Sequence, residues 1–194
     1  MLKNSAMKTT EQITRQLRPL SSVNIRDNFS DQFRTGVIFT LFIVFFALNT
    51  SAQTLQEYRT MIAAMKSSAD PGIRSQATHL ESLVFQLQPK MHIVNSVSTI
   101  TGGTSPVCLE TDDKSVLLLG TVKPLFQTVE LITVRLNGPS DLDFVLNLAA
   151  LSGFGSLKYV QFLCSFQCDP KVISALFTGN KPGITVFYNI SIPN

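Results

Sequence analysis

Cysteines are the residues whose chemistry is easiest to interpret in this sequence, because only three occur: Cys108, Cys164 and Cys168. Cys164 and Cys168 have three residues between them and lie where a predicted strand passes into a predicted helix, whose amino end would lower the pKa of a thiol. The alternatives are a redox or metal-carrying thiol pair and a structural pair, either disulfide-bonded or buried. We favour the structural pair, because the redox motif has two intervening residues and no histidine follows to complete a metal site.

No complete catalytic or cofactor motif is present. The sequence lacks a Gly-x-Ser-x-Gly nucleophile elbow, and the glycine-rich residues 102–104 lack the remainder of a phosphate-binding loop. The acid pairs Asp112-Asp113 and Asp141/Asp143 suit a solvated turn and a helix start. We therefore expect a non-enzymatic protein without catalytic residues, cofactor or metal site.

The amino-terminal residues have the composition of an export signal. An uncharged apolar core, residues 36–48, follows Arg34 and leads through a small-x-small sequence to Gln53. A positive flank, a short apolar core and small exit residues are the three parts of a secretory signal peptide. We predict a signal peptide at residues 36–52, cleaved before Gln53, and a disordered leader at residues 1–35.

This signal determines the expected compartment. Its Ser-Ala-Gln exit resembles signal peptides common in Bacteroidetes, so we expect a periplasmic, cell-surface or secreted protein. The alternative is an uncleaved leader that anchors the chain through a single membrane span, although the apolar core is shorter than the about 20 residues that a span needs. After export the cysteines would meet an oxidising compartment, where pairs form disulfides.

The net charge of +3 belongs to the leader. Residues 53–194 hold equal numbers of basic and acidic residues and no Lys/Arg cluster. Nucleic-acid binding requires several cations that face phosphates, and electrostatic membrane docking requires a basic patch, so the neutral charge argues against both unless an uncleaved leader anchors the chain. The expected partner is a protein or another envelope component. Because the number of cysteines is odd, at least one thiol is free or pairs between chains, and the oligomeric state stays open.

Two amphipathic helices are predicted within residues 53–90. Apolar residues recur at spacings of three and four over residues 54–68 and again over 73–88, and Asp70-Pro71-Gly72 separates the two stripes. Residues 91–194 are predicted to belong to the same domain. The expected fold class is α/β, with this helical pair followed by a mostly parallel sheet.

Strand and helix patterns alternate in the second part. A helix is predicted at 140–151, where Ser140 and Asp143 would form a capping box, and another at 170–177, which Pro170 would open. The carboxyl-terminal end thus forms a βαβαβ block. Strands are predicted at 92–100, 115–122, 131–136, 157–162 and 184–188.

The strand–helix units superpose at a fixed offset of 26 residues. The motif Leu131-x-x-Val134-x-Leu136 recurs as Leu157-x-x-Val160-x-Phe162, and Val186 continues the series. Over residues 130–190 this pattern resembles leucine-rich repeats, whose period is about 20–29 residues. The asparagine or cysteine of that consensus is absent, and an ordinary βαβαβ block without repeat ancestry produces units of the same size.

A leucine-rich-repeat-like arrangement implies an exposed face lined by alternate strand residues. Mixed aromatic, basic and amide side chains on such a face suit a protein interface. We therefore predict an exported, non-enzymatic binding protein; the alternative is a thiol-disulfide redox or metal-carrying protein that uses Cys164 and Cys168. The face would present Thr133, Arg135, Tyr159, Gln161, Thr185 and Phe187.

Overall fold

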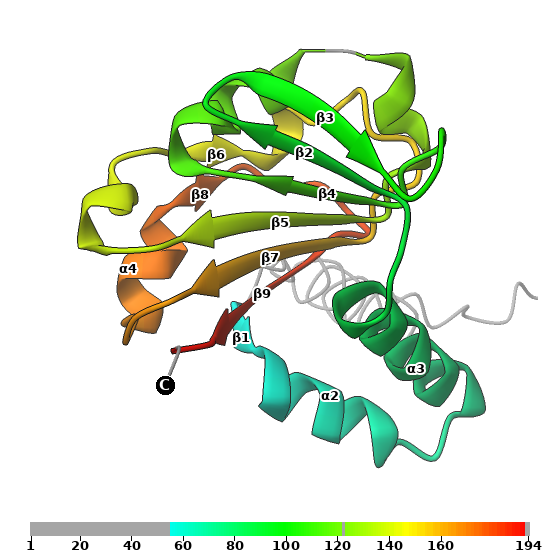
Figure 1. The fold of residues 1–194 in the computed structure, drawn as a ribbon. Coiled ribbons are helices and arrows are strands. Elements are labelled where there is room, and N and C mark those ends of the chain that lie inside the picture. Colours follow the sequence, from blue (N-terminus) through cyan, green and yellow to red (C-terminus); the bar gives the residue numbers. More distant parts are fainter. Residues whose placement is uncertain (1–54, 122, 193–194) are drawn as a thin grey trace, which may run out of the picture. The chain divides into compact units, whose positions relative to one another are not determined.

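The computed structural model describes residues 55–121 and 123–192 (Figure 1). They belong to the second of two compact units into which the chain divides, residues 51–194. The predicted leader and signal peptide, residues 1–52, lie outside the described residues. Within the described ranges, no helix combines the length and the apolar character that crossing a membrane requires.

A seven-stranded sheet forms the centre of this unit, in the order β1-β9-β7-β5-β4-β2-β3. All neighbouring strands in it are parallel except the β2–β3 hairpin. This arrangement confirms the predicted α/β class with a mostly parallel sheet. Its strands are β1 (Gln56–Glu57), β2 (Lys90–Val94), β3 (Val97–Thr101), β4 (Cys108–Thr111), β5 (Leu131–Leu136), β7 (Tyr159–Cys164) and β9 (Thr185–Ile190).

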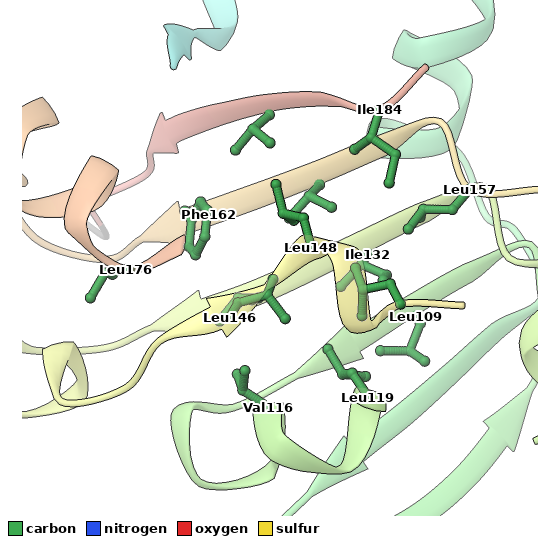
Figure 2. Packing of buried hydrophobic residues seen from close by; sticks show 14 of the residues in the cluster. Leu109, Val116, Leu119, Ile132, Leu146, Leu148, Leu157, Phe162, Leu176 and Ile184 are labelled. Atoms are coloured by element: carbon green, nitrogen blue, oxygen red, sulfur yellow. The ribbon is translucent and has the colours of Figure 1, made fainter. Parts of the chain in front are cut away.

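Strands β2, β4, β5, β7 and β9 follow one another across the sheet in chain order. The chain between β2 and β4 passes through β3, and the three connections from β4 to β9 pack on one face. Consecutive right-handed crossovers in one direction return to the same face of a sheet. On this connection face Leu109, Ile132 and Phe162 pack against Leu119 and Leu148 of the connections (Figure 2). The connections contain 3₁₀ helices η1 (Asp113–Gly120), η2 (Pro124–Thr128), η3 (Pro139–Leu142) and η4 (Leu148–Ala150), helix α4 (Pro170–Ala175), and the paired short strands β6 (Leu146–Asn147) and β8 (Phe177–Thr178).

Two helices, α2 (Tyr58–Lys66) and α3 (Pro71–Phe85), pack on the opposite face near the amino ends of the strands. Helix α3 begins after Asp70, whose carboxylate accepts the Gly72 backbone N–H at 2.7 Å. A second core lies between these helices and the sheet. It consists of Tyr58, Met61, Ile62, Ala77, Leu80 and Leu83 from the helices and Cys108, Leu131, Tyr159 and Phe187 from the strands.

The predicted helix at residues 140–151 is wrong. This segment forms η3, β6 and η4 instead. No capping box forms, because the Ser140 hydroxyl donates to Oδ1 of Asp141 at 3.0 Å instead. The other oxygen of that carboxylate accepts the Asn137 backbone N–H at 2.8 Å. Leu146 then pairs with Phe177 of β8, and this ladder holds the backbone extended. Tertiary pairing therefore overrides the local helix signal.

Two predicted strands also differ from the structure. The segment 115–122 is predicted to be a strand, but residues 115–120 belong to η1 and Thr121 follows it. The Asp112 carboxylate caps η1 by accepting the Ser115 backbone N–H at 2.9 Å. The segment 92–100 is a hairpin rather than one strand. Both residues of Asn95–Ser96 have positive φ, which is the geometry of a two-residue turn between antiparallel strands.

The fixed 26-residue offset holds for only one pair of strands. Tyr159 in β7 pairs with Thr185 in β9, which agrees with that offset. Leu131 in β5 pairs with Tyr159, two positions beyond the expected Leu157. A shift of two residues keeps the same side chains facing inward, so the alternating pattern cannot distinguish the two registers.

Candidate interaction surface

The six predicted surface residues do share one face of the sheet. Register pairs Thr133 with Gln161 and Gln161 with Phe187, and it pairs Tyr159 with Thr185. Arg135 lies two residues after Thr133 in β5 and therefore on the same side. This is the face opposite the connections, the helix-side face.

Half of this predicted surface is not exposed, which corrects the expectation. Tyr159 and Phe187 are 7% and 0% exposed, because α2 and α3 pack over them. The Tyr58 ring of α2 lies 5.5 Å from the Phe187 ring, centroid to centroid. Gln161 is also buried, and its Oε1 accepts the Thr133 hydroxyl at 3.2 Å. These three side chains therefore have a packing role.

Beyond the two helices, the carboxyl ends of the strands leave a polar part of the helix-side face uncovered. Arg135 is exposed there, and its Nη2 lies 2.8 Å from Oε1 of Glu110 in β4. Lys90 in β2 approaches the other oxygen of the same carboxylate at 3.4 Å. We call this surface the carboxyl-end patch. It consists of His92, Glu110, Thr133, Arg135, Leu163 and Asn189, each half-buried or exposed.

Four residues of this patch were absent from the sequence-based surface. Glu110 belongs to β4, a strand of only four residues that is not among the predicted strands. The alternation of buried Leu109 and Thr111 with half-buried Glu110 is the signal that could have revealed it. His92 lies in the predicted strand 92–100 but is not among the predicted interaction residues, and Leu163 and Asn189 follow the predicted ends of their strands.

A second ionic cluster joins α3 to the amino ends of the strands. Oε2 of Glu130 lies 2.9 Å from Nε2 of His79 and accepts a hydrogen bond from Nζ of Lys158 at 2.7 Å. Burial alone would raise the pKa of Glu130, but the hydrogen bonds from Lys158 and His79 outweigh it and lower this pKa. His79 and Lys158 also line a cavity of about 420 Å³ beside Tyr159.

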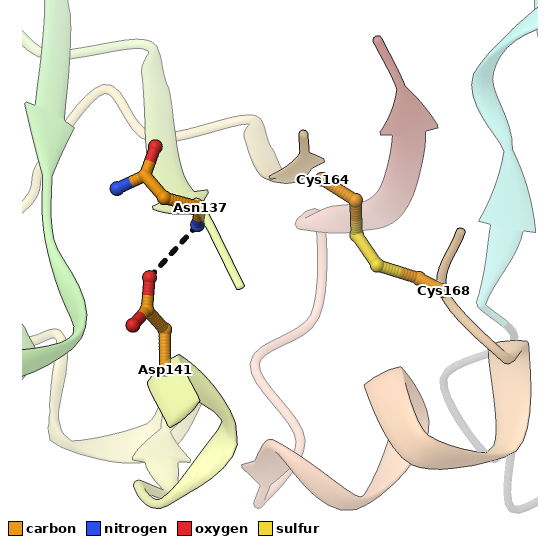
Figure 3. Close-up of a disulfide and its surroundings, with 4 residues drawn as sticks. All are labelled: Asn137, Asp141, Cys164 and Cys168. Carbon is orange, nitrogen blue, oxygen red and sulfur yellow. Dashed lines mark hydrogen bonds between the residues drawn. A yellow bond between two sulfur atoms is a disulfide. The ribbon is translucent and has the colours of Figure 1, made fainter. Parts of the chain in front are cut away.

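The sulfurs of Cys164 and Cys168 are joined in a disulfide that links the end of β7 to the start of α4 (Figure 3). The two residues are 0% and 5% exposed. The Asp169 carboxylate accepts the Lys171 backbone N–H at 2.7 Å and caps α4 directly after the disulfide. A buried bond at the helix start suits a structural staple better than redox turnover, which requires access to a sulfur.

Cys108 is a free, buried cysteine in the second core. Burial raises the pKa of its thiol to about 11, so the thiol is protonated at neutral pH. Its Sγ donates a weak hydrogen bond to the Leu83 carbonyl at 3.4 Å. Among the described residues, no group of three or more His, Cys, Asp or Glu side chains could hold a metal ion.

No protein-family model matches the chain, and neither the curated proteins nor the solved structures include a significant match. Function is therefore inferred from the surfaces described above.

Proposed function

We propose that the chain is an exported, non-enzymatic protein-binding module, and that the carboxyl-end patch contacts its partner. One observation carries this proposal: the connections pack on one face of a parallel sheet, while the opposite face is covered near its amino ends and uncovered at its carboxyl ends. A rigid sheet holds side chains from adjacent strands at fixed spacings, which is how extended sheets present binding surfaces.

The chemistry of the patch supports a protein partner. Glu110 and Arg135 lie on different strands and form an ion pair, and the Arg135 side chain keeps 45% of its area exposed. Arginine is enriched at protein interfaces because its planar group pairs with carboxylates and stacks on rings. Leu163 adds apolar area beside these charges.

We also propose that the resemblance to leucine-rich repeats reflects the architecture. Strands in chain order, with connections that contain short 3₁₀ helices on one face, support it. Under this proposal, the unequal register offsets correspond to repeats of unequal length. Such repeats bind partners through the face opposite the connections in the family that they resemble, which is the face that carries the patch.

Replacing Arg135 tests the proposed surface. We expect Arg135→Ala to weaken capture of the partner from the native compartment at least tenfold, because a central arginine contributes about 2 kcal/mol or more to an interface. Quantitative mass spectrometry of the captured proteins measures the change. Lys171→Ala, an exposed change in α4 on the connection face, is the matched control. If both variants capture the same proteins as the unmodified chain, the patch is not the binding surface.

A further inference from the structure

We propose a second, independent binding site: the groove between α2, α3 and the carboxyl end of β9 binds an extended peptide segment of a partner protein, which joins the sheet as a strand beside β9. The groove has a volume of about 640 Å³. Peptides commonly bind in this way where a sheet edge lies next to pockets for side chains. Asn189 of the carboxyl-end patch also lines this groove, but the site does not rest on the proposed role of that patch.

The backbone of β9 supplies the first observation. Thr185 N–H donates to the Lys158 carbonyl, and Ser191 N–H donates to the Cys164 carbonyl, so these odd-numbered residues direct their backbone groups toward β7. In a parallel strand the groups of successive residues point to opposite neighbours. The N–H and C=O of Ile190 are therefore directed to the other edge, away from β7.

Strand β1 occupies that edge for only two residues. Its Gln56 and Glu57 are in register with Phe187 and Tyr188, and the chain then enters α2. Among the described residues, none pairs with Ile190 on the edge of β9 that faces β1. The edge already accepts a parallel strand, and one more strand segment would continue the same ladder where β1 stops.

The hydroxyl of Tyr58 supplies the second, independent observation. Tyr58 lines the groove, is 4% exposed, and its hydroxyl has no hydrogen-bond partner among the described residues. A buried hydroxyl without a partner is costly, and a peptide carbonyl or amide would satisfy it. Phe85, which is 68% exposed, lies edge-on to this ring at 5.7 Å between centroids. A ring as exposed as this one can turn aside as a peptide enters.

The remaining lining indicates which peptides fit. Ile62, Phe85 and Ile192 offer apolar surface for one side chain of an extended segment. Arg59 is exposed at the same groove, whereas Lys66 is already paired with Glu81 at 2.7 Å. The favoured segment therefore has alternating apolar residues and an acidic neighbour.

Amide exchange and peptide titration test this site. The probe is a pool of capped hexapeptides with Val, Ile or Phe at alternate positions and one Asp, added at millimolar concentration to the exported, ¹⁵N-labelled protein. We expect slower hydrogen exchange at the Ile190 amide. We also expect Tyr58→Phe to weaken binding of the tightest peptide by on the order of tenfold, the effect of one buried hydrogen bond. Tyr188→Phe, on the connection face of the same strand, should bind the peptide unchanged.

Backbone methylation of the peptide separates strand addition from apolar adsorption. Strand β9 ends at Ile190, so one N–H of an added strand would donate to the Ile190 carbonyl. N-methylation of that peptide N–H should abolish binding, and N-methylation of the next N–H, which faces away from β9, should be tolerated. The proposal is wrong if no peptide in the pool binds, if both methylated peptides bind equally, or if Tyr58→Phe binds as tightly as the unmodified protein. Arg135→Ala should leave peptide binding unchanged. The groove and the carboxyl-end patch can therefore be shown wrong independently of each other.

Discussion

Glu130 connects three elements through single side-chain contacts. It lies directly before β5, accepts a hydrogen bond from Lys158 before β7, and lies 2.9 Å from His79 of α3. Both partners favour the ionised carboxylate, which is why its pKa is lowered although burial opposes ionisation. Because the pKa is lower in the folded chain, the contribution to stability is complete above the unfolded pKa of about 4.3 and is lost as the pH falls through the folded value.

Glu130→Gln should therefore flatten the acid side of the stability profile. At neutral pH we expect a loss of about 1 kcal/mol in the free energy of unfolding, because the two charge-assisted contacts are replaced by neutral ones. Below the folded pKa of Glu130 the variant and the unmodified protein should converge. Urea unfolding at neutral and acidic pH measures both values, and a difference that stays constant across this range would contradict the assignment.

Among the elements, β6 and β8 show how a two-residue strand pair is held in place. The Asn147 side chain accepts the Ala149 backbone N–H at 3.0 Å and starts η4. Gly179 follows β8 with φ +75°, and a Cβ there would lie 2.7 Å from Oδ1 of Asn147 and 3.2 Å from the Ala149 nitrogen. The pair and the turn after it therefore require glycine at this position for space as well as for conformation.

Two glycine replacements separate the cost of backbone strain from the cost of the steric contact. Gly183 has φ +86°, and a Cβ at this position would meet no atom within 4 Å, so Gly183→Ala should cost only backbone strain, about 1 kcal/mol. Gly179→Ala should cost about 2–3 kcal/mol, because it also displaces the Asn147 cap. Denaturant unfolding compares the two variants. Equal losses would show that the contact with Asn147 adds nothing.

At the scale of the whole molecule, one sheet serves two cores. The connection face packs against the crossovers, and the helix-side face packs against α2 and α3 through a smaller set of residues. Phe187 is fully buried in that smaller core, where it contacts the Tyr58 ring. The attachment of the two helices therefore depends on few strand side chains.

Phe187→Ala should loosen the helices more than the sheet. We expect a loss of about 3–5 kcal/mol in global stability, the usual cost of the cavity that such a truncation leaves. Hydrogen exchange should accelerate in α3 before it accelerates in β5, because the crossovers still cover the other face. An equal acceleration in both elements would mean that helices and sheet open as one unit.

The sequence alone determined several features of this protein. Alternating apolar residues identified β5, and Pro170 identified the start of α4, because both signals act locally. The alternation of strand and helix patterns predicted the mostly parallel sheet. The spacing of Cys164 and Cys168, with no histidine after it, favoured a structural pair, and the two sulfurs are joined in a disulfide. The alternation of side chains along each strand also placed all six predicted surface residues on one face, since this alternation depends only on the strand itself.

Only the tertiary structure decided which parts of that face are open. Residues 140–151 follow a helical pattern, but pairing of β6 with β8 imposes an extended backbone. The register between β5 and β7 depends on the length of their connection, which the alternating pattern of apolar residues does not reveal. Tyr159 and Phe187 are buried because α2 and α3, distant in sequence, pack over them. Burial is a property of what covers a side chain, and that is settled by contacts between segments far apart in the chain.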